Sequence, residues 1–128
     1  MKIEKFEDLE IWQLARELCK NFLVITISEP FCNDFKLRDQ IRSSSGSFLD
    51  NVPEGFKRNG NKEFIQFLSV AKGSCGECRS QSYRAYDYQH TDNDTLKDLV
   101  LRTSTLSKKI SRFITYLKQS DLKGTKFL

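Results

Sequence analysis

Two evenly spaced rows of apolar and small residues dominate the second half of the chain. Within each row the intervals alternate between three and four residues, an average of about 3.5. This spacing keeps one face of a helix turned toward a partner along its whole length. The first row is Phe64, Leu68, Ala71, Cys75, Cys78, Ser82 and Ala85, and the second is Leu96, Leu99, Thr103, Leu106, Ile110, Phe113 and Leu117. Each row therefore predicts a long helix packed lengthwise against others.

The residues that favour turns and helix ends divide the chain into four such helices. Two prolines and six glycines in 128 residues favour few, long elements. Asn61 and Thr91 are the expected caps of the third and fourth helices. Short connections between long antiparallel helices predict an all-α, up-down-up-down four-helix bundle as a single domain over residues 1–128. The expected helices are 7–27, 34–57, 61–88 and 92–119, followed by a tail at 120–128.

Composition excludes several classes of protein. With 38% hydrophobic and 30% charged residues, the chain is neither disordered nor membrane-spanning, and it is long enough to bury a core. No apolar run approaches the roughly 20 residues that cross a bilayer. The charged start, Met1 to Leu9, lacks the apolar stretch of a secretory signal. We therefore expect no membrane association and a cytoplasmic location.

The second helix is the least certain element from local sequence alone. The run from Ser43 to Ser47 is also compatible with a flexible linker. Pro53 lies where the helix should continue, and an interior proline costs about 3 kcal/mol.

Positive charge concentrates toward the C-terminus. Residues 1–60 carry a net charge of −1 and residues 61–128 carry +5. Such a basic region attracts nucleic-acid phosphates or an acidic protein surface, although a solvated helix face is the simpler interpretation. Tyrosines 83, 86 and 88 offer base stacking or, more commonly, helix and subunit contacts. The candidate nucleic-acid-binding residues are Arg102, Lys108, Lys109, Arg112 and Lys118, with Lys123 and Lys126 behind them.

Residues that could carry catalysis or metal binding are few. Cys75 and Cys78 form a C-x-x-C motif, but both lie on the inner row of the third helix, so buried, reduced thiols are the favoured interpretation. His90, the single histidine, lies at a predicted turn without an evident catalytic partner. We therefore expect no enzyme activity, no metal and no cofactor.

Asn51 and Glu54 form a more specific pair, one turn apart on the second helix. A buried carboxylate requires a cation and hydrogen bonds, and Arg42, Arg79 and Arg84 are possible partners. We expect these two residues to form a structural polar clamp that fixes helix register; a ligand or partner site is the alternative.

Several stretches of the chain together resemble the 23S rRNA intervening-sequence proteins, also called four helix bundle proteins. The match covers the first three predicted helices, and the fourth agrees only in pattern. Pro53 and Ser43–Ser45 depart from the family, which usually has alanine, arginine or apolar residues there, so we expect a kinked or interrupted second helix. The matching stretches are Phe6-Glu7-Asp8-Leu9, Ile11-Trp12, Ala15, Gln40-Ile41-Arg42, Ser47, Asn51-Val52-Pro53-Glu54-Gly55, Lys62-Glu63-Phe64-Ile65-Gln66-Phe67-Leu68, Ala71-Lys72-Gly73-Ser74 and Glu77.

The resemblance implies a four-helix bundle that assembles as a ring-shaped homopentamer, encoded within insertions of bacterial 23S rRNA genes and without known catalysis. A related branch, the accessory variability determinant of diversity-generating retroelements, implies nucleic-acid binding beside a reverse transcriptase. The favoured hypothesis is a non-enzymatic homo-oligomer that binds RNA or DNA through its basic face. The alternative is a protein-interaction module, an accessory subunit to another protein such as a reverse transcriptase.

Overall fold

The computed structural model describes residues 3–122 as an all-helical bundle. Within that range there are helices and no strand, which confirms the predicted fold class. The long helices are α1 (Glu10–Ile27), α2 (Phe35–Phe56), α3 (Asn61–Asp87) and α4 (Asn93–Leu122), and two short 3-10 helices, η1 (Phe6–Asp8) and η2 (Phe31–Asn33), precede α1 and α2. None of the described helices is both long and apolar enough to span a bilayer.

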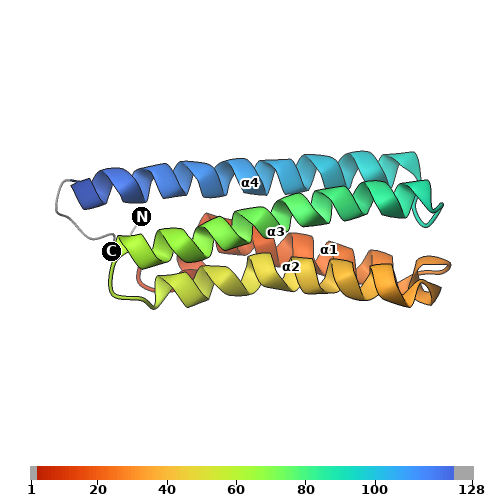
Figure 1. Cartoon of the computed structure of the whole chain (residues 1–128), viewed down its shortest axis with the longest axis horizontal. Coiled ribbons are helices and arrows are strands. Elements are labelled where there is room, and N and C mark those ends of the chain that lie inside the picture. The colour runs from red at the N-terminus through yellow and green to blue at the C-terminus, as the bar shows by residue number, and fades with distance from the viewer. Residues whose placement is uncertain (1–2, 123–128) are drawn as a thin grey trace.

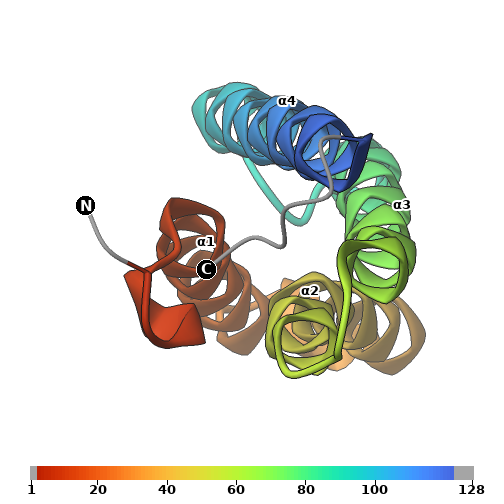
Figure 2. The same ribbon diagram turned by 90° about the vertical axis from the view of Figure 1, so that its left-hand side faces the viewer.

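The four helices run antiparallel and follow one another around the bundle (Figure 1). Seen end-on, α1, α2, α3 and α4 form an arc in chain order, with α1 and α4 at its two ends (Figure 2). The most extensive packing is between α2 and α3 and between α3 and α4, whereas the packing of α1 on α4 is the least extensive among adjacent helices. The bundle is therefore more open along the α1–α4 side than elsewhere.

Both predicted rows face the core. All seven residues of the α3 row are buried, as are six of the seven in α4; Phe113 is partly buried and packs against the same cluster. The largest fully buried side chains include Phe22, Phe31 and Phe48. Removing an aromatic or aliphatic side chain of this kind from water contributes about 1.5–3 kcal/mol. The periodicity of the sequence thus determines which faces of α3 and α4 become the interior.

Helix α2 is continuous from Phe35 to Phe56, so the interruption, one of the two outcomes expected from Pro53 and Ser43–Ser45, does not occur. The serine-rich run is also helical, with the hydroxyls of Ser44 and Ser45 donating to the carbonyl oxygens of Gln40 and Arg42 at 3.1 and 3.2 Å. Pro53 lies in the last turn of α2, three residues before its end, and its missing N–H removes one backbone hydrogen bond, the one to the carbonyl oxygen of Leu49 in the preceding turn. The neighbouring Val52 is fully buried, so this turn is packed against the core.

The helix ends also differ from the expected ones. Asn61 is the first residue of α3 rather than its cap, and its buried amide donates to the carbonyl oxygen of Leu117 on α4 at 3.2 Å. At α4, the carboxylate of Asp92, not the hydroxyl of Thr91, accepts from the N–H of Thr95 at 2.8 Å. Helix α1 begins at Glu10 after η1, and α4 extends through Leu122, so the predicted tail is helical over its first three residues. The rest of that tail, with Lys123 and Lys126, lies outside the described residues.

The close approach of α2 to the start of α3 is possible because residue 55 is glycine. A Cβ atom there would lie 2.7 Å from Cδ1 of Phe64 and 2.9 Å from Cβ of Phe67. The second of these atoms is fixed by the α3 backbone and cannot move aside. The absence of a side chain at Gly55 therefore allows α2 and α3 to pack this closely.

We expect Gly55→Ala to lower the free energy of unfolding by about 1–3 kcal/mol, because the added methyl group forces α2 and α3 apart. Gly46→Ala is the matched control on the same helix, since a Cβ there meets nothing within 4 Å. It should raise stability by about 0.5–1 kcal/mol through helix propensity. Urea unfolding followed by circular dichroism measures both, and equal stability of Gly55→Ala and the original chain would contradict the packing described here.

Candidate functional site

The basic residues predicted on α4 fall into two groups. Lys108, Arg112 and Lys118 are exposed, and no described carboxylate forms an ion pair with any of them. Arg102 and Lys109 are instead paired with carboxylates, Arg102 with Asp98 at 3.0 Å and Lys109 with Glu10 at 3.1 Å. Only the first group therefore offers uncompensated positive charge.

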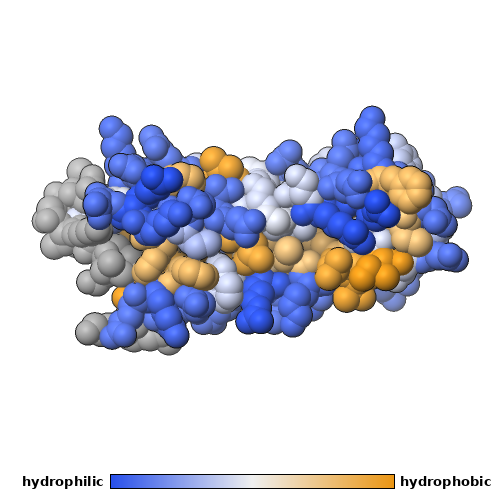
Figure 3. All heavy atoms as spheres, turned by 90° about the horizontal axis from the view of Figure 1, so that it is seen from below, coloured by the Kyte–Doolittle hydropathy of each residue, from blue (hydrophilic) through white to orange (hydrophobic). Residues whose placement is uncertain are grey.

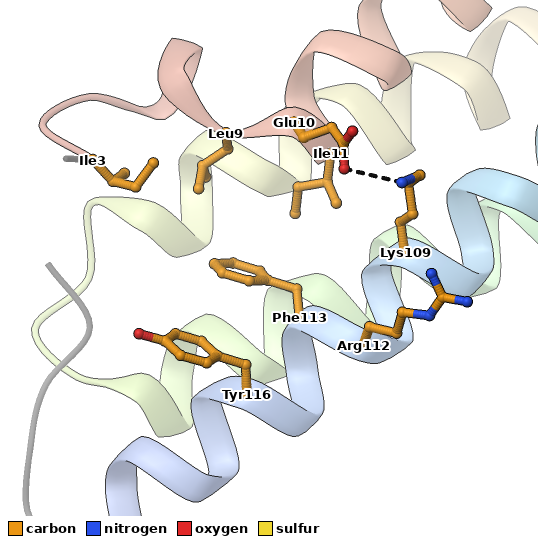
Figure 4. Close-up of a pocket in the computed structure, with 8 residues that line it drawn as sticks. All are labelled: Ile3, Leu9, Glu10, Ile11, Lys109, Arg112, Phe113 and Tyr116. Atoms are coloured by element: carbon orange, nitrogen blue, oxygen red, sulfur yellow. Dashed lines mark hydrogen bonds and ion pairs between the residues drawn. The ribbon is translucent and has the colours of Figure 1, made fainter. Parts of the chain in front are cut away.

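The open side between α1 and α4 contains two apolar hollows. The larger, of about 430 Å³, lies where α1 begins, and the ion pair between Lys109 and Glu10 joins α1 to α4 at one end of it (Figure 4). A second hollow of about 270 Å³ lies further along the same two helices, with Arg102 at its edge. Neither lining includes a histidine or a cysteine. The larger hollow is lined by Ile3, Leu9, Glu10, Ile11, Lys109, Arg112, Phe113 and Tyr116.

The polar link between α2 and α3 differs from the predicted clamp. The amide of Asn51 donates to the carbonyl oxygen and the hydroxyl of Ser47, at 2.8 and 3.1 Å, and Ser74 of α3 donates to the same hydroxyl at 2.8 Å. This chain of hydrogen bonds crosses from α2 to α3 and includes Asn51 as predicted. Glu54 takes no part in it.

Glu54 is 44% exposed, so its expected burial beside an arginine is wrong. It pairs with Lys57 and Arg58 at 3.2 and 3.5 Å, at the end of its own helix. The three arginines proposed as its partners bridge helices through neutral groups: Arg42 to Thr26, Arg79 to Ser104 and Arg84 to Gln40.

The cysteines of the C-x-x-C motif are interior packing residues. Cys75 and Cys78 are 1% and 0% exposed, and all four cysteines are free thiols. Burial raises the pKa of the Cys75 thiol to about 12 and also raises that of Cys78. Because a thiolate is the reactive form, neither thiol is suited to redox chemistry at neutral pH. Among the described residues, no three histidine, cysteine or carboxylate side chains converge on a possible metal position.

His90 connects two loops at the end of the bundle. Its Nε2 lies 2.9 Å from Oδ2 of Asp34, and its ring stacks on Phe31 at 4.9 Å between centroids. Asp34 also caps α2 by accepting from the N–H of Leu37 at 3.2 Å. The hydrogen bond from His90, followed by the one from Leu37, lowers the pKa of Asp34 below its ordinary value of 3.8. The arrangement joins the start of α2 to the α3–α4 turn.

A family model for the 23S rRNA-intervening sequence protein matches residues 7–112. The chain belongs to this family. The match to the 23S rRNA-intervening sequence family continues into α4 as far as Arg112, further than the three helices recognised from sequence motifs. Comparison with curated proteins found no match.

Two surface features of this family member were not singled out from the sequence. On the face seen in Figure 3, apolar side chains gather toward the end where α1 stops and α2 starts. The exposed apolar residues there are Leu23, Val24 and Ile27 of α1 and Phe35 of α2, which together we call the apolar patch.

The second feature is a set of cations on α3 and the start of α4, namely Lys72, Arg79 and Lys97, all exposed. Helical-wheel angles could have located these cations, but only the packing shows that α3 and α4 lie side by side.

We expect Asp34→Asn to lower the free energy of unfolding by about 1 kcal/mol near pH 6, because the variant loses the negative charge that faces His90 and the N-terminal end of α2. The lowered pKa means that ionised Asp34 stabilises the fold above pH 3.8 and that this contribution disappears as the pH falls through the lower folded value. The difference between the variant and the original chain should therefore shrink from pH 5 to pH 3. Thermal unfolding across this range measures it.

Asp50→Asn, on the exposed middle of α2, serves as the control and should change little at any pH. A stability difference for Asp34→Asn that stays constant down to pH 3 would show that the cap does not depend on the carboxylate charge.

Proposed function

We propose that this 23S rRNA-intervening sequence family member is a non-enzymatic, homo-oligomeric bundle that binds RNA or DNA through the exposed cations of α4. The observation that carries the proposal is the uncompensated charge of Lys108, Arg112 and Lys118 on a helix with no acidic residue from Thr103 to Ser120. Cations of this kind attract phosphates irrespective of base sequence.

Assembly would strengthen such contacts. A few lysines per subunit bind weakly, but several copies in one particle act at a high effective concentration on the same strand. The apolar patch supports self-association, since Val24, Ile27 and Phe35 are 64%, 59% and 62% exposed. Large apolar side chains that gather on one face mark protein contacts. The family resemblance suggests a homopentamer as the assembled state.

Binding through backbone charge predicts a steep loss of affinity with salt. We expect the double variant Lys108→Ala/Arg112→Ala to bind a labelled oligonucleotide more weakly and to show a shallower dependence of log K on log salt. The slope should decrease by about 0.7–0.9 for each phosphate that the variant no longer neutralises. Fluorescence anisotropy at several salt concentrations measures both quantities.

The matched control is Lys36→Ala/Lys62→Ala, which removes the same amount of unpaired positive charge from exposed positions on α2 and α3. This control variant should retain most of the affinity for the oligonucleotide. Binding that does not change with salt, or no binding at low salt, would remove the proposal.

Self-association through the apolar patch predicts that added charge will dissociate the oligomer. We expect Val24→Lys/Ile27→Lys to shift the molar mass toward that of the monomer, because burying two ammonium groups in a subunit contact is unfavourable. Gel filtration with light scattering measures the mass. Val70→Lys, at a position 53% exposed on α3, is the control and should leave it unchanged. An unchanged mass for the double variant would place the subunit contact elsewhere.

The same apolar patch also suits the alternative function, an accessory subunit whose partner is another polypeptide such as a reverse transcriptase. The two functions differ in what holds the complex together. A complex with a protein partner that persists after nuclease treatment and is abolished in Val24→Lys/Ile27→Lys would support the accessory role.

A further inference from the structure

The side of the bundle where α3 and α4 meet presents exposed cations and exposed tyrosine rings. Arg79 of α3 donates to the hydroxyl of Ser104 on α4 at 3.3 Å, which identifies the facing sides of the two helices. At about 100° per residue, residues within about 40° of Arg79 or of Ser104 lie along this line of contact. We call the following set the α3–α4 edge: Lys72, Arg79, Tyr83 and Tyr86 of α3, with Lys97, Lys108 and Lys118 of α4.

The edge is positively charged because the described acidic side chains of α3 and α4 lie away from it. Glu63 and Glu77 lie about 160° around α3 from Arg79, and Asp98 lies about 120° around α4 from Ser104. Asp98 is also already paired with Arg102. Asp87 and Asp94, about 80° from the line, are the nearest carboxylates, and both lie at one end. The five cations of the edge form no ion pair with a described carboxylate.

An apolar hollow opens beside one of the tyrosines. It has a volume of about 440 Å³ and combines the Tyr83 ring with the side chains of Val100 and Leu101, while Lys97 stands at its rim. Tyr83 is 49% exposed and Tyr86 is 38% exposed, so both rings reach solvent. An exposed aromatic face next to apolar side chains and a cation provides a stacking surface for a planar base and a contact for its phosphate.

This combination distinguishes between forms of nucleic acid. In a duplex the faces of the bases are stacked on one another, so a protein ring cannot lie against them unless the base is extruded. In a single strand the base faces are accessible, and aromatic stacking adds to backbone charge. The cations extend from Lys97 to Lys118, about 32 Å along α4, which provides a track for several consecutive nucleotides.

We infer that the α3–α4 edge is a binding track for single-stranded nucleic acid, with Tyr83 as a base-stacking residue over the adjacent hollow. This inference rests on the proposed function and narrows it, because it selects single strands over duplexes. It also places the binding surface on two helices instead of α4 alone. Lys108 and Lys118 belong to both proposals. Arg102 and Lys109 face α1 and do not belong to the α3–α4 edge.

The test compares Tyr83→Leu with Tyr83→Phe, using a labelled 15-nucleotide poly-uridine strand, a duplex of the same length and heparin as a polyanion without bases. We expect Tyr83→Leu to weaken single-strand binding about 5- to 100-fold, because the stacking face is removed, and Tyr83→Phe to retain it. Duplex affinity should change less than about twofold in either variant. Tyr88→Leu is the control, since that ring contacts Arg84 and His90 and lies off the edge.

Salt dependence provides a second readout. Lys97→Ala/Lys118→Ala should reduce the slope of log K against log salt by about 1.4, at about 0.7 for each single-strand phosphate contact, whereas Tyr83→Leu should leave the slope unchanged. Thermal unfolding confirms that the variants remain folded.

The outcomes separate the two proposals. Equal binding of the single strand by Tyr83→Leu and the original chain would overturn the proposed single-strand track. Binding of the duplex or of heparin as tightly as the single strand would also overturn it. Salt-dependent binding would then still support the proposed function. Absence of binding to every oligonucleotide at low salt would overturn both. Absence of oligonucleotide binding together with a nuclease-resistant protein complex would favour the accessory-subunit role.

Discussion

The close packing of α3 between α2 and α4 is the constraint on which the rest of the bundle depends. Its inner face carries Ala71, Cys75, Cys78, Ser82 and Ala85, whose small side chains allow two neighbours to approach at once. On the α2 side the approach is completed by Gly55, where a Cβ atom would collide with Phe64 and Phe67. Because α3 is held from both sides, its outer surface and that of α4 keep a fixed relation, and a surface shared by the two helices becomes possible.

The sequence predicts the helices and their inward faces well because periodicity is a local property. The α3 and α4 rows required no knowledge of the partner helices, and the structure confirms them. Prediction failed where the outcome depends on tertiary neighbours. Asn61 resembles a cap, yet its amide reaches across to α4; Pro53 resembles a break, yet Val52 beside it is anchored in the core. Glu54 was expected to be buried with an arginine, and instead it pairs with cations of the adjacent turn.

For the candidate binding surface, too, the sequence predicts one part and only the structure shows the rest. The excess of basic residues in the second half of the chain is evident from composition alone, but charge that is already paired contributes little to attracting a ligand. Only the structure shows that Lys109 faces Glu10 across the open side of the bundle, while Lys108, its neighbour in sequence, does not. Likewise, Lys72 and Lys97 are 25 residues apart in the sequence, and the antiparallel packing of α3 and α4 brings them to one edge.

The arc in which the helices follow one another also bears on how fast the chain reaches its native state. Nearly all helix packing joins consecutive elements, and the one pairing between the first and last helices is the least extensive. Few long stretches of chain therefore have to be closed before favourable contacts form, which is the topology of the most rapidly folding domains. Two consecutive helices can therefore form most of their mutual packing soon after both have been synthesised, before the C-terminal end of the polypeptide is made.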